Sequence, residues 1–331
     1  MEIMQGVHQI KIPLPDLPPG HVNVYMVEGK ESNLLIDAGW NTPEAFSVLR
    51  DELKKDGFSF NDIGQIVITH LHPDHYGLAG KIKELSGATI ALSEIEAGML
   101  DLRYVKMNIL LKEMVDFLSS NGVPQDELPQ LSEASLPISR FVIPALPDIK
   151  LKAGDKISVD SLEFEVLLTP GHSPGHICLY EPRRRFLFSG DHVLPEITPT
   201  IGFHPQSGIN PLGDFVDSLK SLSKLDANFI FPAHDSVFNG LGLRIEELLR
   251  HHEQRKSTIL RIIKDDMRTG YEVANGIPWV NDINPVSFQD LATLDRRVAV
   301  LETLAHLQLL VFEDKARKVI RDNVNFYWAS S

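Results

Sequence analysis

The sequence predicts an α/β protein that carries a smaller, mainly helical region at its C-terminal end. Short apolar, β-branched runs alternate with helix-type segments through most of the chain, whereas the last part is typical of helices. Four of the apolar runs are separated by at most two residues from a following histidine or aspartate, as expected when a rigid sheet positions a shared set of side chains. The length of 331 residues suits one large domain and a smaller one.

The N-terminal part contains the first strands and a helix. The expected elements are strands at 8–12, 22–27, 33–36 and 65–69 and a helix at 42–55. Pro43 suits the first turn of that helix, because its fixed φ fits a helix start. The segment Asp37-Ala38-Gly39 after the third strand is typical of a turn.

Four strands each deliver a polar side chain just beyond their C-terminal ends. The strand–residue pairs are 65–69 with His70, 163–169 with His172, 185–188 with Asp191, and 228–231 with His234. Function-bearing side chains commonly sit on loops that a rigid sheet holds. We therefore expect these residues to share one site along one edge of the sheets.

A long insertion and the C-terminal region complete the predicted domain organisation. Residues 96–119 have a helix-like apolar pattern, which fits either a hairpin packed on the core or a cap lining a substrate pocket. Beyond His234, helices are expected at 241–263 and 290–310, followed by a short hairpin. The sequence thus predicts a catalytic domain at 1–245, with a candidate helical cap at 96–148, and a helical C-terminal domain at 246–331.

The composition narrows the class of protein. There are 32 basic and 45 acidic residues, so the formal charge is −13, which argues against a protein that coats nucleic acid or anionic membrane. The single cysteine, Cys178, excludes internal disulfides and Cys-rich zinc sites and is expected to be buried in a strand. The chain has no apolar stretch near ~20 residues and no signal-peptide pattern. We expect a cytoplasmic protein with no membrane partner.

The segment from His70 to His75 has the residue types of a metal site. Three imidazoles and one carboxylate within six positions have little packing use after an apolar strand, whereas divalent cations bind such donors. In extended chain His70 and His72 point to the same side and can chelate one ion. Pro73 suits a turn that would direct Asp74 and His75 towards a neighbouring ion.

Five motifs, in order across residues 5–240, resemble the metallo-β-lactamase superfamily. The motifs are Leu35-Ile36-Asp37-Ala38-Gly39, His70-x-His72-x-Asp74-His75, Thr169-Pro170-Gly171-His172-Ser173-Pro174-Gly175-His176, Ser189-Gly190-Asp191-His192 and Pro232-Ala233-His234-Asp235. The resemblance implies an αβ/βα four-layer sandwich, in which two mixed sheets lie face to face and the metals sit at one edge.

The resemblance also implies how the ligands are divided. His70, His72 and His172 would hold a first metal, Asp74, His75 and His234 would hold a second, and Asp191 would bridge them. This set implies two divalent ions. Nitrogen and oxygen donors suit zinc, with iron and manganese as alternatives.

The implied chemistry is hydrolysis by water activated between two cations. Two divalent ions that share a water lower its pKa from about 15.7 toward ~7, so hydroxide is available at neutral pH. Asp74 is the candidate to orient that hydroxide and to carry a proton to the leaving group. Asp37 is the candidate acceptor for a ligand imidazole, or else only a turn former. His176 and His192 lie within four residues of ligands and could contact substrate or support the site.

Two enzyme functions and one non-enzyme function fit these observations. The loops at 169–176 and 190–192 look most like the glyoxalase II-like branch, which implies a small-molecule thioester, lactone or ester substrate. Arg183-Arg184-Arg185 could bind an anion, but a solvated turn between strands is the alternative.

The main alternative is an endoribonuclease or phosphodiesterase, since residues 296–307 resemble the winged-helix appendage of some bacterial members. Residues 285–331 hold six acidic and six basic residues, a net charge of 6 − 6 = 0, without a basic stripe. This balance favours an appendage that packs on the core or forms a homodimer interface over one that binds nucleic acid. A regulator that only senses metal is the third hypothesis.

Overall fold

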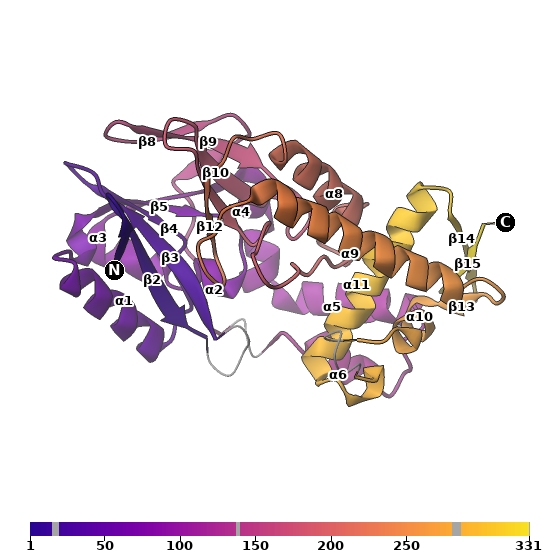
Figure 1. Cartoon of the computed structure of the whole chain (residues 1–331). Helices are drawn as coiled ribbons and strands as arrows, with labels where there is room; N and C mark the ends of the chain where they lie inside the picture. The colour runs from indigo at the N-terminus through magenta and orange to yellow at the C-terminus, as the bar shows by residue number, and fades with distance from the viewer. Residues whose placement is uncertain (15–19, 137–139, 280–285, 331) are drawn as a thin grey trace.

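Two β-sheets lie face to face in the larger part of the molecule, and helices cover their outer faces (Figure 1). This computed structural model describes residues 1–14, 20–136, 140–279 and 286–330. The core between the sheets consists of side chains from both sheets. Among them is Tyr25 of the first sheet, whose ring makes edge-to-face contacts with Phe188 and Phe231 of the second sheet. The Tyr25 hydroxyl donates to the carbonyl of Pro232 at 2.7 Å, which joins the sheets near one edge.

The first sheet is mixed. Its strands, in spatial order, are β1 (Glu2–Met4), β2 (Val7–Pro13), β3 (His21–Val27), β4 (Asn33–Ile36), β5 (Ile63–Ile68), β6 (Thr89–Ser93) and β7 (Ile149–Leu151). Strands β1 to β4 pair antiparallel and β4 to β7 pair parallel. Parallel pairs need crossover connections. These include α1 (Pro43–Lys55), α2 (Pro73–Tyr76) and α3 (Ala79–Ser86).

Helix α1 shows why a crossover covers the sheet. The Thr42 hydroxyl accepts a hydrogen bond from the amide of Ala45, and Pro43 is the first helical residue. Ala45, Leu49 and Leu53 recur at helical spacing and are buried against the outer face of the first sheet.

The second sheet is also mixed. Its strands, in spatial order, are β12 (Phe229–Pro232), β11 (Phe186–Gly190), β10 (Ile177–Glu181), β9 (Leu162–Leu168) and β8 (Lys156–Val159). Only β11 and β12 run parallel. Helices α8 (Pro211–Leu222) and α9 (Leu241–Ile262) cover its outer face. The predicted α/β class with two facing mixed sheets is confirmed, and Cys178 is buried in β10 as expected.

The insertion and the C-terminal region contain the remaining elements. The insertion has α4 (Glu94–Leu100), a π-helical turn (Asp101–Val105), α5 (Met107–Ser120) and α6 (Leu128–Glu133). After α9 come β13 (Arg268–Thr269), α10 (Gly270–Gly276), α11 (Thr293–Phe312), β14 (Ala316–Arg321) and β15 (Val324–Ala329). Short 3₁₀ turns lie at Phe60–Asp62 and Phe288–Asp290. The last three strands form an antiparallel sheet in the order β13-β15-β14.

The insertion packs on the C-terminal region and shares its hydrophobic core. Leu118 of α5 and Leu131 of α6 lie in one buried cluster with Ala274 of α10 and Leu304 of α11, and the four helices lie side by side in Figure 1. The insertion therefore packs against the C-terminal helices.

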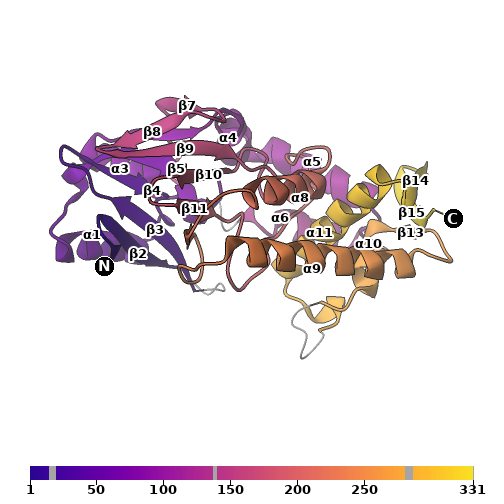
Figure 2. The same ribbon diagram turned by 45° about the horizontal axis from the view of Figure 1, so that its top comes forward.

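Helix α9 links the two parts of the molecule. Its Ile245 packs with α8 and the second sheet, whereas Ile259 lies in the C-terminal cluster, so the helix runs from beside the sheets into the C-terminal region (Figure 2). The division of the chain at residue 245 remains a proposal, because α9 continues across it. Within the described residues, no helix is both long and apolar enough to cross a membrane.

Removing a side chain from the shared core should destabilise the protein. Leu118 is fully buried, and Leu118→Ala leaves a cavity that we expect to lower the free energy of unfolding by about 2–5 kcal/mol, measured by urea denaturation. Leu243→Ala, at a position on α9 that is 71% exposed, is the control and should change it by less than about 0.5 kcal/mol. Equal effects of the two variants would show that α5 does not share the core.

Candidate metal centre

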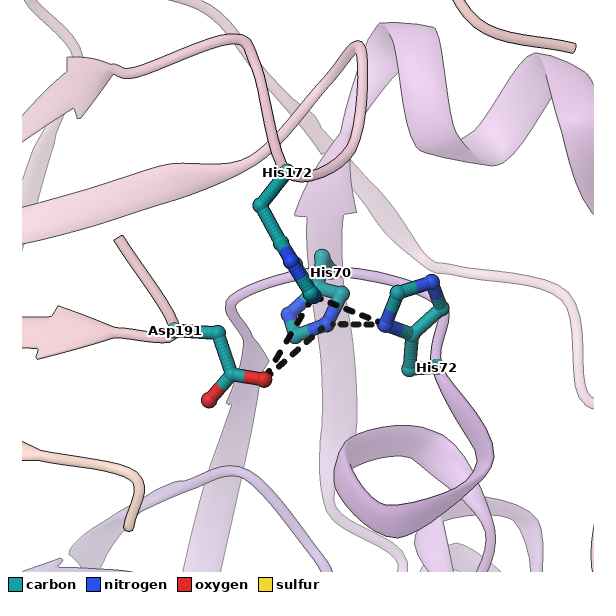
Figure 3. A group of neighbouring side chains, drawn as sticks. All are labelled: His70, His72, His172 and Asp191. Carbon is teal, nitrogen blue, oxygen red and sulfur yellow. Dashed lines mark hydrogen bonds and ion pairs between the residues drawn. The ribbon is translucent and has the colours of Figure 1, made fainter. Parts of the chain in front are cut away.

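Four side chains from three separate loops converge at one edge of the sheets (Figure 3). His70 and His72 follow β5, His172 follows β9, and Asp191 follows β11. The Nδ1 atom of His72 lies 2.9 Å from Nε2 of His70 and 2.9 Å from Nε2 of His172. Oδ2 of Asp191 lies 3.4 Å from the His172 nitrogen and 4.0 Å from the His70 nitrogen.

A second group of three side chains lies directly beside the first. Oδ2 of Asp74 is 3.6 Å from Nε2 of His75 and 3.4 Å from Nε2 of His234. Asp191 contacts this group as well, since Oδ2 is 3.4 Å from His75 and Oδ1 is 3.4 Å from His234. The carboxylate of Asp191 therefore stands between the two groups.

The structure brings all seven predicted ligands together, and their surroundings fit divalent cations. In each group the nitrogen and oxygen atoms lie within 4.8 Å of one another. Nε2 of His75 and Oδ1 of Asp191 are buried and have no hydrogen-bond partner among the described residues. Buried polar atoms without partners are costly, and cations on these imidazole and carboxylate atoms would remove that cost.

In three of these histidines, the Nδ1 atom donates a hydrogen bond, while Nε2 faces the ligand group. His75 donates from Nδ1 to Asp37 Oδ2 at 2.8 Å, His172 to the carbonyl of Thr200 at 2.8 Å, and His234 to the carbonyl of His21 at 2.9 Å. Such bonds fix the tautomer and leave Nε2 free to bind a metal.

Asp37 also holds the start of the His70 loop. Its carboxylate accepts from the amide of Thr69 at 2.8 Å and from the Thr69 hydroxyl at 3.0 Å. The residue has a positive φ of 61°, a backbone conformation that aspartate tolerates better than most residues. The structure thus places Asp37 both in the expected turn and against a ligand imidazole.

The carboxylates divide the five imidazoles into two electrostatic classes. Burial lowers the pKa of His70, His72 and His172 below its usual value. For His75 and His234 burial acts in the same direction, but the neighbouring carboxylates outweigh it, raising the pKa of His75 well above its usual value and that of His234 to about 10.

The two carboxyl groups are shifted in the opposite sense. Burial alone would raise the pKa of Asp191 and Asp74, but the neighbouring imidazoles, chiefly His234 for the former and His75 for the latter, lower both. Both groups are therefore carboxylates at neutral pH.

His176 and His192 lie behind the ligands. Nε2 of His176 accepts from the amide of Asp191 at 3.1 Å, and its Nδ1 lies 2.8 Å from the Thr169 hydroxyl, so this ring holds the Asp191 loop. A side chain at Gly190, which has a φ of 51°, would come within 2.6 Å of His176, so this position needs glycine. His192 is buried between His176 and Phe215.

Glu96 is a buried supporting residue that the sequence analysis did not single out. Its carboxylate accepts from the amide of Leu71 at 2.9 Å and from the Ser173 hydroxyl and the amide of Gly175 at 2.5 and 2.8 Å. It therefore ties the His70–His72 loop to the His172 loop. The sequence signal is Ser93-x-x-Glu96 at a helix start, but Glu96 reaches other loops instead of the amide of Ser93.

The Arg183-Arg184-Arg185 segment lies far from this centre along the strands. It forms the turn between β10 and β11, at the opposite end of β11 from Asp191. Arg185 pairs there with Asp226, and Arg184 donates to the carbonyl of Gln5. The segment is thus a surface turn between two strands, which was the alternative to an anion-binding site.

Comparison with known proteins identifies the family. A model described as the Metallo-beta-lactamase superfamily matches residues 17–234, more than half of the chain. The chain belongs to the metallo-beta-lactamase superfamily. The prediction of a metal-dependent hydrolase is confirmed at this level.

Relatives match this superfamily member over nearly its whole length. A protein of Bacillus subtilis named probable metallo-hydrolase YqjP is 27% identical, with 98% of each chain covered. The crystal structure of metallo-beta-lactamase family protein TTHA1429 from Thermus thermophilus has a TM-score of 0.83 at 27% identity, covering 99% of this chain and 100% of that one. A beta-lactamase domain protein from Burkholderia ambifaria shares the fold, with a TM-score of 0.80 at 21% identity and coverage of 100% and 94%. The insertion and C-terminal region are therefore part of a shared architecture.

Metal binding should release about two protons at pH 7 from the imidazoles of His75 and His234, in addition to the proton lost by metal-bound water. Without metal, the raised pKa of His75 and that of His234, which rises to about 10, favour protonated imidazoles, whereas the lowered pKa values of the other three imidazoles leave them neutral. Titration calorimetry with Zn²⁺ in buffers of different ionisation enthalpy gives the number directly. His234→Ala should reduce it by about one, and release of no protons would contradict this charge distribution.

Loss of the Glu96 carboxylate should loosen the metal centre. Glu96→Ala leaves the amides of Leu71 and Gly175 without their acceptor, and we expect metal affinity to fall about 10–100-fold in chelator competition. Glu94→Ala on the same helix removes an exposed carboxylate and should leave affinity unchanged. Equal affinity of both variants would mean that Glu96 does not position the ligand loops.

Proposed function

We propose that this protein hydrolyses a small carbonyl substrate, namely a thioester, lactone or ester, with two divalent cations, for which zinc is the best match. The observation that carries the proposal is the position of the Asp191 carboxylate, which lies within 3.4 Å of ring nitrogens from both groups of ligands. His70, His72 and His172 would hold one cation, and Asp74, His75 and His234 the other.

When bound, the cations would supply Lewis acidity for the carbonyl oxygen and would lower the pKa of water. Asp74 contributes proton transfer. Its lowered pKa keeps it a carboxylate, and it is less buried than Asp191, so it can accept a proton and return it to the leaving group.

The donor atoms support zinc. Imidazole nitrogen and carboxylate oxygen suit this ion, although they also suit iron and manganese. The thiol of Cys178 takes no part, because burial raises its pKa to about 12 and its sulfur faces Thr169 and the carbonyl of Ser189.

A winged helix that binds nucleic acid is the second candidate. The order of helix α9, strand β13, helices α10 and α11 and the hairpin β14–β15 supports the winged-helix interpretation. In such modules a helix enters the major groove. Here α11 is buried at Val300, Leu304 and Leu307, and it packs against α6, α8, α9 and α10. The burial of α11 and the balanced charge of residues 285–331 favour a structural role for the C-terminal region over nucleic-acid binding. They therefore favour a carbonyl substrate over a nucleic acid.

Removing the Asp74 carboxylate should strongly reduce turnover. We expect zinc-reconstituted protein to hydrolyse members of a thioester and lactone panel, and Asp74→Asn to lower kcat by about 10²–10⁴-fold because proton transfer is lost. Metal content, measured by elemental analysis, separates this effect from loss of the ion. Asp217→Asn on the exposed face of α8 is the control. Cleavage of an RNA panel without turnover of any carbonyl substrate would favour the second candidate instead.

A further inference from the structure

The π-helical turn at Asp101–Val105 lies against the first metal-binding loop. The hydroxyl of Tyr104 donates to the carbonyl of Leu71, between His70 and His72, and the Tyr104 ring stacks on Tyr76. These contacts hold the turn beside the metal centre. π-helical turns are rare and frequently occur at functional sites.

Arg103, in the same turn, has a buried nitrogen without a partner. Its Nη1 atom is inaccessible and makes no hydrogen bond among the described residues. A buried guanidinium nitrogen without an acceptor is costly. This position is therefore suited to an anionic acceptor that the described part of the chain does not supply.

A second guanidinium, that of Arg297 on α11, also pairs with no carboxylate among the described residues. Its Nη1 atom donates to the Ser135 hydroxyl at 2.8 Å and to the carbonyl of Ser132 at 3.5 Å. Burial and then Arg103 lower the pKa of Arg297 to about 10, so the two like charges are neighbours. By contrast, the adjacent Arg296 pairs with the carboxylate of Glu127 at 3.1 Å.

The loop between Asp191 and α8 connects these arginines with the metal ligands. The carbonyl of Thr200 accepts from His172, and three residues later the amide of Phe203 donates to the carbonyl of Leu301, one helical turn beyond Arg297. His204 follows, and burial, Arg103 and Arg297 lower its pKa to about 3.

We propose that Arg103 and Arg297 bind an anionic group of the substrate, a carboxylate or a phosphate, beside the metal ligands His72 and His172. This inference rests on the proposed function for the reacting carbonyl. The planar guanidinium offers paired donors that match either oxyanion. The chain has a formal charge of −13, so as a whole it repels anions. The two neighbouring arginines are a local exception to this repulsion, because they pair with no carboxylate among the described residues.

The proposed anion site also gives a role to the insertion and to the C-terminal region. Arg103 comes from the insertion and Arg297 from the C-terminal region, and these regions share one hydrophobic core. Their packing would set the distance between the anion site and the metals, and thereby the length of substrate that fits.

Anion binding can be measured directly. Succinate and inorganic phosphate are titrated calorimetrically into zinc-loaded wild type, Arg103→Gln, Arg297→Gln and their lysine counterparts. We expect at least one anion to bind wild type, with Kd rising about tenfold or more in each glutamine variant and less in the lysine variants. Arg50→Gln, which removes an exposed arginine from α1, is the control. Metal content and thermal unfolding verify each variant. Equal Kd values in wild type and both glutamine variants, or no binding to wild type, would overturn the proposal.

Turnover then identifies the anion. S-acetylpantetheine is neutral, S-succinylpantetheine carries a carboxylate, and S-acetyl-4′-phosphopantetheine carries a phosphate. The anionic thioester that fits should show a kcat/KM at least about tenfold above the neutral one, and the glutamine variants should lose this advantage. Equal turnover of all three thioesters by wild type and variants contradicts the anion site. Lost anion binding in the variants without turnover of any carbonyl substrate contradicts the proposed function and leaves the anion site standing.

Discussion

The buried carboxylate of Asp191 is the group on which the arrangement of this molecule depends. It lies among the imidazoles of His70, His75, His172 and His234 at the edge of two sheets, where an isolated charge would be very costly. The surrounding imidazoles lower its pKa, so the charge is retained. A centre of this kind requires that the strand ends bring their side chains together accurately, and the two facing sheets provide that rigidity.

Three buried polar side chains connect the loops that carry the ligands. Asp37 joins the turn after β4 to Thr69 and His75, Glu96 joins the His70–His72 loop to the His172 loop, and His176 holds the amide of Asp191. Each connects segments that lie far apart in the sequence. Because each makes bonds to the backbone, the loops are fixed as well as the ligands themselves, which is the usual way in which a protein tunes a metal site.

The insertion and the C-terminal region form a second body around one hydrophobic core, and this body reaches the metal centre at two places. Tyr104 contacts the carbonyl of Leu71, and Phe203 joins the loop behind His172 to α11. Helix α11 is consequently buried on several sides. A helix in that position suits the shaping of a substrate site better than the reading of a groove in DNA or RNA, which requires exposed side chains.

The sequence by itself indicated the class of fold and the residues of the candidate metal centre, through apolar runs that end near a histidine or an aspartate and through motifs that resemble a known family. Short strands such as β1 and β7 carry too few residues for such a pattern, so sequence periodicity does not reveal them. Only the tertiary structure decided which distant residues support the site. Glu96, Arg103 and Arg297 look like ordinary helix charges until the fold shows what surrounds them. The burial and the neighbours of a charge are properties of the packed chain, because they depend on segments that lie far apart in the sequence.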